Sequence, residues 1–171
     1  MRAIFLILCA VLLNGCLGMP ESVKPVSDFE LNNYLGKWYE VARLDHSFER
    51  GLSQVTAEYS ARNDGGISVL NRGYSEEKGE WKEAEGKAYF VNGSTDGYLK
   101  VSFFGPFYGS YVVFELDREN YSYAFVSGPN TEYLWLLSRT PTVERGILDK
   151  FIEMSKERGF DTNRLIYVQQ Q

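Results

Sequence analysis

Residues 55–74 read VTAEYSARNDGGISVLNRGY, and this stretch decides the fold class. Apolar and polar side chains alternate in 55–62 and again in 67–74, with the two-residue period of a half-buried β-strand. The NDGG sequence at 63–66 tolerates the positive φ angles of a tight turn. The stretch therefore predicts an antiparallel hairpin.

The same alternation continues on both sides of this hairpin, and turn residues interrupt it at short intervals. Short connections imply that each strand pairs with the next one along the chain. About eight strands at this spacing indicate a sandwich or a closed barrel. The other expected strands are 38–46, 81–91, 98–104, 111–117, 121–127 and 133–138, followed by a short last strand at 165–168.

One segment near the C-terminus has a helical period instead. Val143, Ile147, Phe151 and Met154 recur at the spacing of one helix face, and Gly159 suits a left-handed C-terminal cap. Because this helix has a single apolar face, we expect it to pack against the outside of the strands.

The first residues resemble the export signal of a bacterial lipoprotein. Residues 3–13 form an apolar run, too short to span a bilayer, that leads to Gly15 and Cys16. The resemblance implies a signal peptide at 1–15, a lipid on Cys16 and a tether at 16–27. An ordinary secretory leader with an incidental cysteine is the alternative. Cys9 would leave with the leader, so residues 16–171 would hold no free thiol and no disulfide.

Charge and residue content exclude several classes of function. The 18 Lys and Arg against 23 Asp and Glu, with no basic stripe, do not suit a nucleic-acid binder. His46 is the only histidine, so no metal site and no cofactor are expected. The enzyme alternative would need a carboxylate pair such as Glu40 and Glu115 as acid and base.

Three motifs in order resemble those of the lipocalin family, in particular its bacterial outer-membrane members. Gly36-Lys37-Trp38 is similar to the G-x-W motif, 130–133 with Thr131 and Tyr133 to the second motif, and Arg139 to the third. The resemblance covers 16–170. It implies an all-β fold, an eight-stranded antiparallel up-and-down barrel with one C-terminal helix outside, in a domain at 28–171. It also implies that Trp38 closes the barrel floor and that Arg139 packs over its ring.

Aligning motifs and alternation identifies the side chains that should face the interior and bind a ligand. Small residues among them leave room, while aromatic and aliphatic ones make the wall apolar; a core filled by side chains is the alternative. Glu40, Asn71, Lys82 and Glu115 are the polar side chains expected to point inward or to lie near the rim. A lipid head group could bind Lys82 or the tyrosine hydroxyls; the alternative is that these polar residues satisfy one another at the floor or rim. The predicted ligand-binding residues are Ala42, Val55, Ala57, Tyr59, Val69, Asn71, Lys82, Ala84, Gly86, Leu99, Val101, Phe103, Tyr111, Val113, Val126, Tyr133 and Trp135.

The resemblance implies a protein anchored to the outer membrane through Cys16 and facing the periplasm. There it would bind, store or transport a fatty acid or a lysophospholipid, in membrane biogenesis or repair under stress. A lipid-modifying enzyme and a purely structural envelope lipoprotein are the alternatives. Phe104, Phe107 and Tyr108 surround a Gly-Pro turn. They could form a lid, a membrane-facing tip, or a contact in a homodimer, since the family includes dimers.

Overall fold

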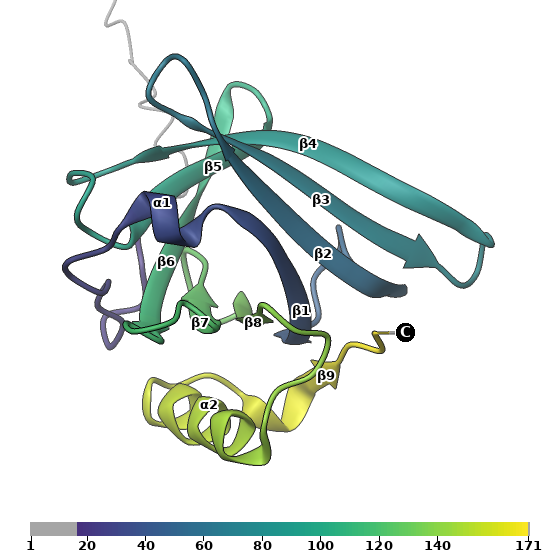
Figure 1. The fold of residues 1–171 in the computed structure, drawn as a ribbon. Helices are drawn as coiled ribbons and strands as arrows, with labels where there is room; N and C mark the ends of the chain where they lie inside the picture. The colour runs from purple at the N-terminus through teal and green to yellow at the C-terminus, as the bar shows by residue number, and fades with distance from the viewer. Residues whose placement is uncertain (1–16, 171) are drawn as a thin grey trace, which may run out of the picture.

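The hairpin predicted from residues 55–74 is present and slightly longer than expected. Strand β2 (Leu52–Ala61) pairs antiparallel with β3 (Ile67–Ser75), and Gly65 in the turn has a φ of 80°. The computed structural model describes residues 17–170 (Figure 1). The predicted leader and Cys16 lie outside the described residues. Within 17–170, no helix combines the length and apolarity needed to cross a membrane.

The strands close into the predicted eight-stranded up-and-down barrel. Each strand pairs antiparallel with its successor, and β1 pairs with both β2 and β8, which closes the sheet. The short β9 (Leu165–Tyr167) adds to β1 (Gly36–Leu44). The remaining strands are β4 (Glu80–Phe90), β5 (Tyr98–Phe104), β6 (Phe107–Leu116), β7 (Tyr123–Ser127) and β8 (Leu134–Ser138).

The two ends of the barrel differ. The closed end contains the start of β1 and a short helix, α1 (Leu31–Tyr34). This helix was not predicted from the sequence. At the other end, here called the open end, β1 ends and β2 begins. The connections at the open end are 45–51, 76–79, 105–106 and 128–133.

Trp38 and Arg139 meet at the closed end, as the resemblance implied. The Arg139 guanidinium lies 3.9 Å from the centre of the Trp38 ring, and the indole N–H donates to Tyr34 O at 2.8 Å. Gly36 has a φ of 93°, a value that favours glycine. Arg139 also donates to the backbone oxygens of Asn33, Leu35, Lys37 and Tyr121.

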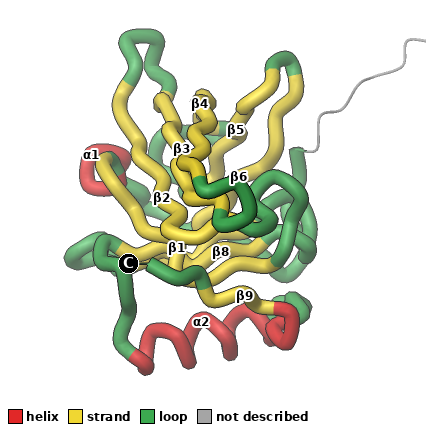
Figure 2. Tube along the Cα trace, turned by 90° about the vertical axis from the view of Figure 1, so that its right-hand side faces the viewer, coloured by secondary structure: helices red, strands yellow, loops and turns green. Residues whose placement is uncertain are grey.

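Helix α2 (Arg145–Glu157) packs on the outside of the barrel, as predicted (Figure 2). Its Phe151 is fully buried, and the Phe151 ring meets the Phe125 ring edge-on at 5.0 Å. The outer face of β7 and its neighbours therefore forms a second apolar core, distinct from the one inside the barrel.

A bulge in β1 makes one inward prediction wrong. Pairing with β8 shifts between Glu40 and Ala42, so Val41 is an extra residue and the alternation inverts. Ala42 consequently lies in the outer core beside α2, not in the barrel. Arg43 takes the inward position instead and is 1% exposed.

A second bulge, in β6, makes the inward prediction for Glu115 wrong. The register shifts between Val113 and Glu115. Glu115 faces out, where its carboxylate lies 2.6 Å from Nζ of Lys150 on α2. Glu40 and Glu115 therefore lie on opposite faces of the barrel wall and cannot form one acid–base pair.

Candidate ligand cavity

A cavity lies inside the barrel between the closed end and the 45–51 connection. The cavity has a volume of about 100 Å³ and is partly open to solvent. Among the described residues that line it, none is Lys, Arg or His. The wall is therefore mainly apolar, with two carboxylates at one corner.

Ten of the seventeen predicted residues line this cavity, and they come from five strands, β2, β3, β5, β6 and β8. They are Val55, Ala57, Tyr59, Val69, Asn71, Leu99, Val101, Phe103, Tyr111 and Trp135. Glu40, named above as a polar candidate, lines it as well. The prediction missed Phe48, Glu49, Thr56, Ile67 and Ser110. Phe48 and Glu49 belong to a connection between strands, where alternation gives no signal.

Val113 and Val126 face inward but do not line the cavity. They pair with each other across β6 and β7, and both are fully buried in the inner core. Tyr133 lies at the open end, where its ring stacks with that of Phe48 at 6.4 Å. These three residues pack behind or beside the residues that line the cavity and do not line it themselves.

Lys82, Ala84 and Gly86 do not line the cavity, because β4 leaves the barrel wall. Pairing of β4 with β5 begins only at Lys87, so the first part of β4 pairs with β3 alone and projects outward (Figure 1). Lys82 and Ala84 are exposed. Gly86 lies under the Phe103 ring, which a Cβ atom there would approach to 2.8 Å.

Three tyrosine hydroxyls form a hydrogen-bonded group inside the barrel. The Tyr111 hydroxyl lies 2.6 Å from that of Tyr34 and 2.9 Å from that of Tyr59. Burial raises the pKa of all three phenols, so they are neutral at physiological pH. Because they satisfy one another, the cavity surface near them stays effectively apolar.

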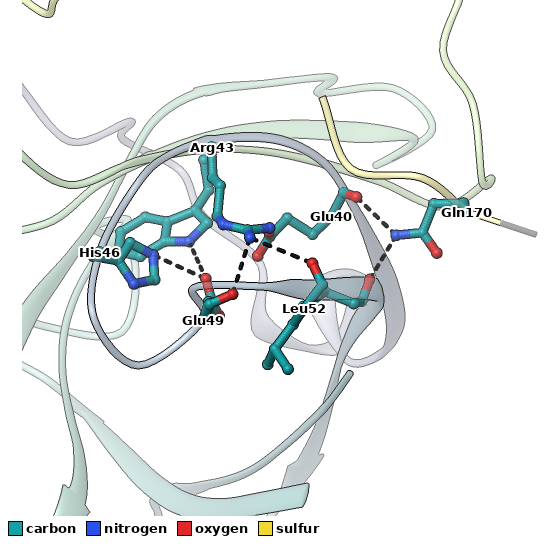
Figure 3. Close-up of polar contacts among 8 residues, drawn as sticks. Glu40, Arg43, His46, Glu49, Leu52 and Gln170 are labelled. Carbon is teal, nitrogen blue, oxygen red and sulfur yellow. Dashed lines mark hydrogen bonds and ion pairs between the residues drawn. The ribbon is translucent and has the colours of Figure 1, made fainter. Parts of the chain in front are cut away.

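Opposite this group, the β1 bulge and the 45–51 connection bring charged side chains together at the open end (Figure 3). Arg43 Nη1 donates to Glu40 Oε1 at 2.7 Å, and Arg43 Nη2 donates to the backbone oxygen of Glu49 at 2.9 Å. Glu49 Oε2 accepts from Trp135 Nε1 at 3.1 Å and lies 2.9 Å from His46 Nε2. All five residues are buried or partly buried, so this corner is a buried polar network rather than a solvated rim. Within residues 17–170, Arg43 Nε and His46 Nδ1 have no hydrogen-bond partner in it.

The pKa values of the two carboxyl groups in this network are shifted in opposite directions. Burial, together with the nearby Glu49, raises the pKa of Glu40 well above its usual value, although Arg43 opposes the shift. Burial also opposes ionisation of Glu49, but hydrogen bonds from His46 and Trp135, with the charge of Arg43, lower its pKa. The favoured state leaves Glu49 ionised beside His46 and Trp135 and lets Glu40 hold a proton.

We expect the free energy of unfolding to fall as the pH rises above the usual glutamate pKa of about 4.5, because of Glu40. The folded chain holds this proton more tightly than the unfolded chain, so the stabilisation is complete at low pH and is lost towards the folded pKa. Glu40→Gln should flatten this fall in urea unfolding measured from about pH 5 to 8. Glu58→Gln, on the exposed face of β2, is the control and should leave the slope unchanged.

The last described residues complete the wall beside this network. The Gln170 side-chain amide donates to Glu40 O on β1 and to Val55 O on β2, both at 2.8 Å (Figure 3). Gln54 N also donates to Gln169 O. The gap where β1 and β2 separate is thus bridged by the C-terminal segment.

Asn71 supplies a further polar group to the cavity. Its Oδ1 atom is buried and has no hydrogen-bond partner among residues 17–170. A buried amide oxygen without a partner is costly, and a bound hydrogen-bond donor would remove that cost. Asn71 is therefore a candidate contact for the polar part of a ligand.

The fold and its cavity define the class of protein, and comparison with known sequences agrees. Residues 29–170 match the family described as the lipocalin-like domain. The chain belongs to the lipocalin family.

Particular relatives share most or all of the chain. It is 98% identical, over the full length of both chains, to the outer membrane lipoprotein Blc of Vibrio cholerae. It is 52% identical to the protein of the same name from Escherichia coli K12, covering 88% of this chain and 85% of the relative. These names denote a lipoprotein and give no reaction.

Solved structures of lower sequence identity support the fold. Insecticyanin from the tobacco hornworm Manduca sexta aligns with a TM-score of 0.71 at 23% identity, covering 89% of this chain and 86% of that one. Lobster apocrustacyanin A1 aligns with a TM-score of 0.67 at 20% identity, covering 89% and 93%. At these identities the likeness concerns the barrel alone.

Proposed function

We propose that this protein is an outer-membrane lipoprotein that binds a single-chain lipid, a fatty acid or a lysophospholipid, inside its barrel. The observation that carries the proposal is the mainly apolar cavity inside the barrel, for which small residues such as Ala57 and Ala88 leave space. Storing or transporting such a lipid for membrane biogenesis or repair would follow from that binding.

The space available favours a slender ligand. One water occupies about 10–15 Å³ of such a cavity. The roughly 100 Å³ present therefore suits an alkyl chain better than a bulky ring system. Each methylene removed from water contributes about 0.8 kcal/mol, so binding gains strength with chain length.

The polar contacts favour a head group that does not rely on a basic side chain in the cavity. Lys82 is exposed on β4, so it does not face a ligand in the cavity. The polar groups that do line the cavity include Asn71 and the carboxyl groups of Glu40 and Glu49. A protonated fatty acid, or a lysophospholipid whose head group reaches solvent at the open end, fits these groups better than a buried carboxylate anion.

The sequence at the N-terminus and the names of the relatives support the proposed anchor. Cleavage after residue 15 would leave Cys16 to carry the lipid, with residues 16–27 as the tether to the domain at 28–171. More than one acyl chain on this cysteine would give stable attachment. The protein would then face the periplasm.

A binding protein is favoured over the two alternatives. Glu40 and Glu115, the acid–base pair considered for an enzyme, do not meet, since Glu115 pairs with Lys150 outside the barrel. A purely structural envelope lipoprotein gives no account of the unfilled space beneath Trp135 and Phe48.

Filling the cavity should abolish lipid binding without unfolding the protein. Ala88 lines the cavity and is 4% exposed, so the ring in Ala88→Phe would occupy the ligand's space. Ala84→Phe is the matched control, four residues earlier on β4 and exposed. We expect at least a tenfold loss of affinity for a C16 fatty acid and a C16 lysophospholipid in Ala88→Phe alone, measured by Trp135 fluorescence.

Equal affinity in the two variants would contradict binding in this cavity. Trp135→Phe identifies the signal, because Trp38 and Trp81 also fluoresce. Native mass spectrometry of the purified full chain provides a second test, in which a co-purified lipid should be present in the wild type and absent from Ala88→Phe.

A further inference from the structure

The turn between β5 and β6 carries the most exposed large apolar side chains in the described part of the chain. Phe104 is 79% exposed and Phe107 is 65% exposed, and the two residues pair across the turn. Exposure of two adjacent phenyl rings to water is unfavourable. Exposed apolar patches of this kind mark interaction sites. The segment Phe104-Gly105-Pro106-Phe107 is here called the β5–β6 tip.

The surroundings of the β5–β6 tip are free of charge along the chain. No Asp, Glu, Lys or Arg occurs from 101 to 114, between Lys100 and Glu115. The neighbouring β3–β4 turn differs sharply, since Glu76, Glu77 and Glu80 are exposed there. A surface that enters an apolar medium must not carry ionised side chains, so the β5–β6 tip alone meets this requirement at the open end.

The start of the described chain is hydrogen-bonded to β6, the strand that begins at the β5–β6 tip. The backbone N–H of Gly18 donates to Ser110 Oγ at 2.9 Å, and Ser110 is on β6, three residues after Phe107. Three residues of a strand span about 10 Å. The N-terminal end of the described chain is therefore held against the open half of the barrel wall.

The chain between Gly18 and the proposed anchor covers most of that distance, and the attached lipid would cover the rest. Cys16 lies two positions before Gly18, and an extended chain covers about 7 Å over two residues. A lipid attached to Cys16 can therefore reach the level of Phe104 and Phe107. Among residues 17–170, the closed end has no such combination of a nearby anchor and an uncharged aromatic turn.

We propose that the β5–β6 tip inserts into the interface of the phospholipid bilayer that holds the Cys16 anchor, so that the open end of the barrel faces the membrane. The open end is also where Phe48 and Phe103 border the cavity. A single-chain lipid could then pass between bilayer and cavity without crossing bulk water. The orientation rests on the proposed acylation of Cys16, and the lipid passage on the proposed binding function.

The first test measures the depth of the β5–β6 tip in the bilayer. Acylated full-length protein is reconstituted in phosphatidylethanolamine–phosphatidylglycerol vesicles whose acyl chains are brominated. Phe107→Trp places a fluorophore on the tip, and Val91→Trp places one on an exposed site at the closed end, 37% exposed in the wild type. We expect brominated lipid to quench the added tryptophan at least twofold more in Phe107→Trp than in Val91→Trp.

Equal quenching at the two sites would overturn the proposal. Binding of a second copy of the chain to the tip would also overturn it. In that case the emission of Phe107→Trp would change with the protein-to-lipid ratio and would not depend on whether the lipid is brominated. Both substitutions are at exposed positions, so the fold should tolerate them.

The second test separates docking from lipid binding. In Phe104→Ser/Phe107→Ser, the equilibrium affinity for a fluorescent C16 lysophospholipid should be unchanged, while its transfer rate to vesicles should fall at least fivefold. An unchanged transfer rate would overturn docking as the route of passage. A wild type that binds no lipid would refute the proposed function, yet the quenching result would still decide the orientation.

Discussion

Trp38→Ala is expected to lower the free energy of unfolding by about 3–5 kcal/mol, the usual cost of deleting a fully buried aromatic ring. Trp38 is 0% exposed, and its indole N–H bonds Tyr34 O. Removing the ring also takes away the surface on which the Arg139 guanidinium rests. The loss would therefore combine a cavity at the closed end with a partly buried cation that has lost its aromatic partner.

Urea unfolding followed by far-ultraviolet circular dichroism would measure this change. Trp81→Ala is the matched control: Trp81 is 45% exposed and has Arg72 over its ring, so we expect a loss of about 1 kcal/mol or less. If Trp38→Ala does not fold, Trp38→Phe still tests the idea, because it keeps most of the volume and loses the hydrogen bond to Tyr34. Similar losses at Trp38 and Trp81 would contradict a closing role for Trp38.

Arg43→Met is expected to destabilise the protein by about 3–5 kcal/mol, because it removes one partner from a buried charge network. The Glu40 carboxyl and the Glu49 backbone oxygen would lose their bonds from the guanidinium, and both acidic side chains would stay buried without its charge. Adding Glu40→Gln should recover part of the loss, since it removes one of the two acidic groups left behind.

The control for Arg43 lies seven residues along the chain. Arg50 forms an ion pair with Asp45 at 2.8 Å, and its side chain is 66% exposed. Arg50→Met should therefore change the unfolding midpoint far less than Arg43→Met. An Arg43→Met protein as stable as the wild type, or a double variant less stable than Arg43→Met, would show that the network does not stabilise the open end.

Regular alternation made most of the barrel predictable. Residues 98–104 were predicted with their observed bounds, and the 55–74 hairpin differs by a few residues at its ends. Helix α2 was predictable because one apolar face repeats at helical spacing. The contact of Arg139 with Trp38 joins residues a hundred positions apart, and only the family resemblance indicated it.

The errors arise where strands depart from regular geometry. No residue around Val41 indicates that Val41 is an extra residue in β1. This bulge reverses the inward and outward alternation after it, so that Arg43 and not Ala42 faces the interior. Lys82 and Ala84 alternate as if inward, but the sequence does not show that β4 has left β5 at that point. Glu49 belongs to a connection, and its position depends on contacts with Arg43, His46 and Trp135 that form only in the folded protein.

The bridge that Gln170 makes between β1 and β2 has a consequence for the order of folding. The first strand finds its partners in β2, in β8 and in Gln170, so the ring of strands cannot close before β8 is available, and the bridge forms only after that. Such distant pairings slow folding, because loop closure must precede the contacts that reward it. A chain emerging N-terminus first would thus stay an unclosed sheet until β8 is made, with its apolar interior open to any lipid nearby.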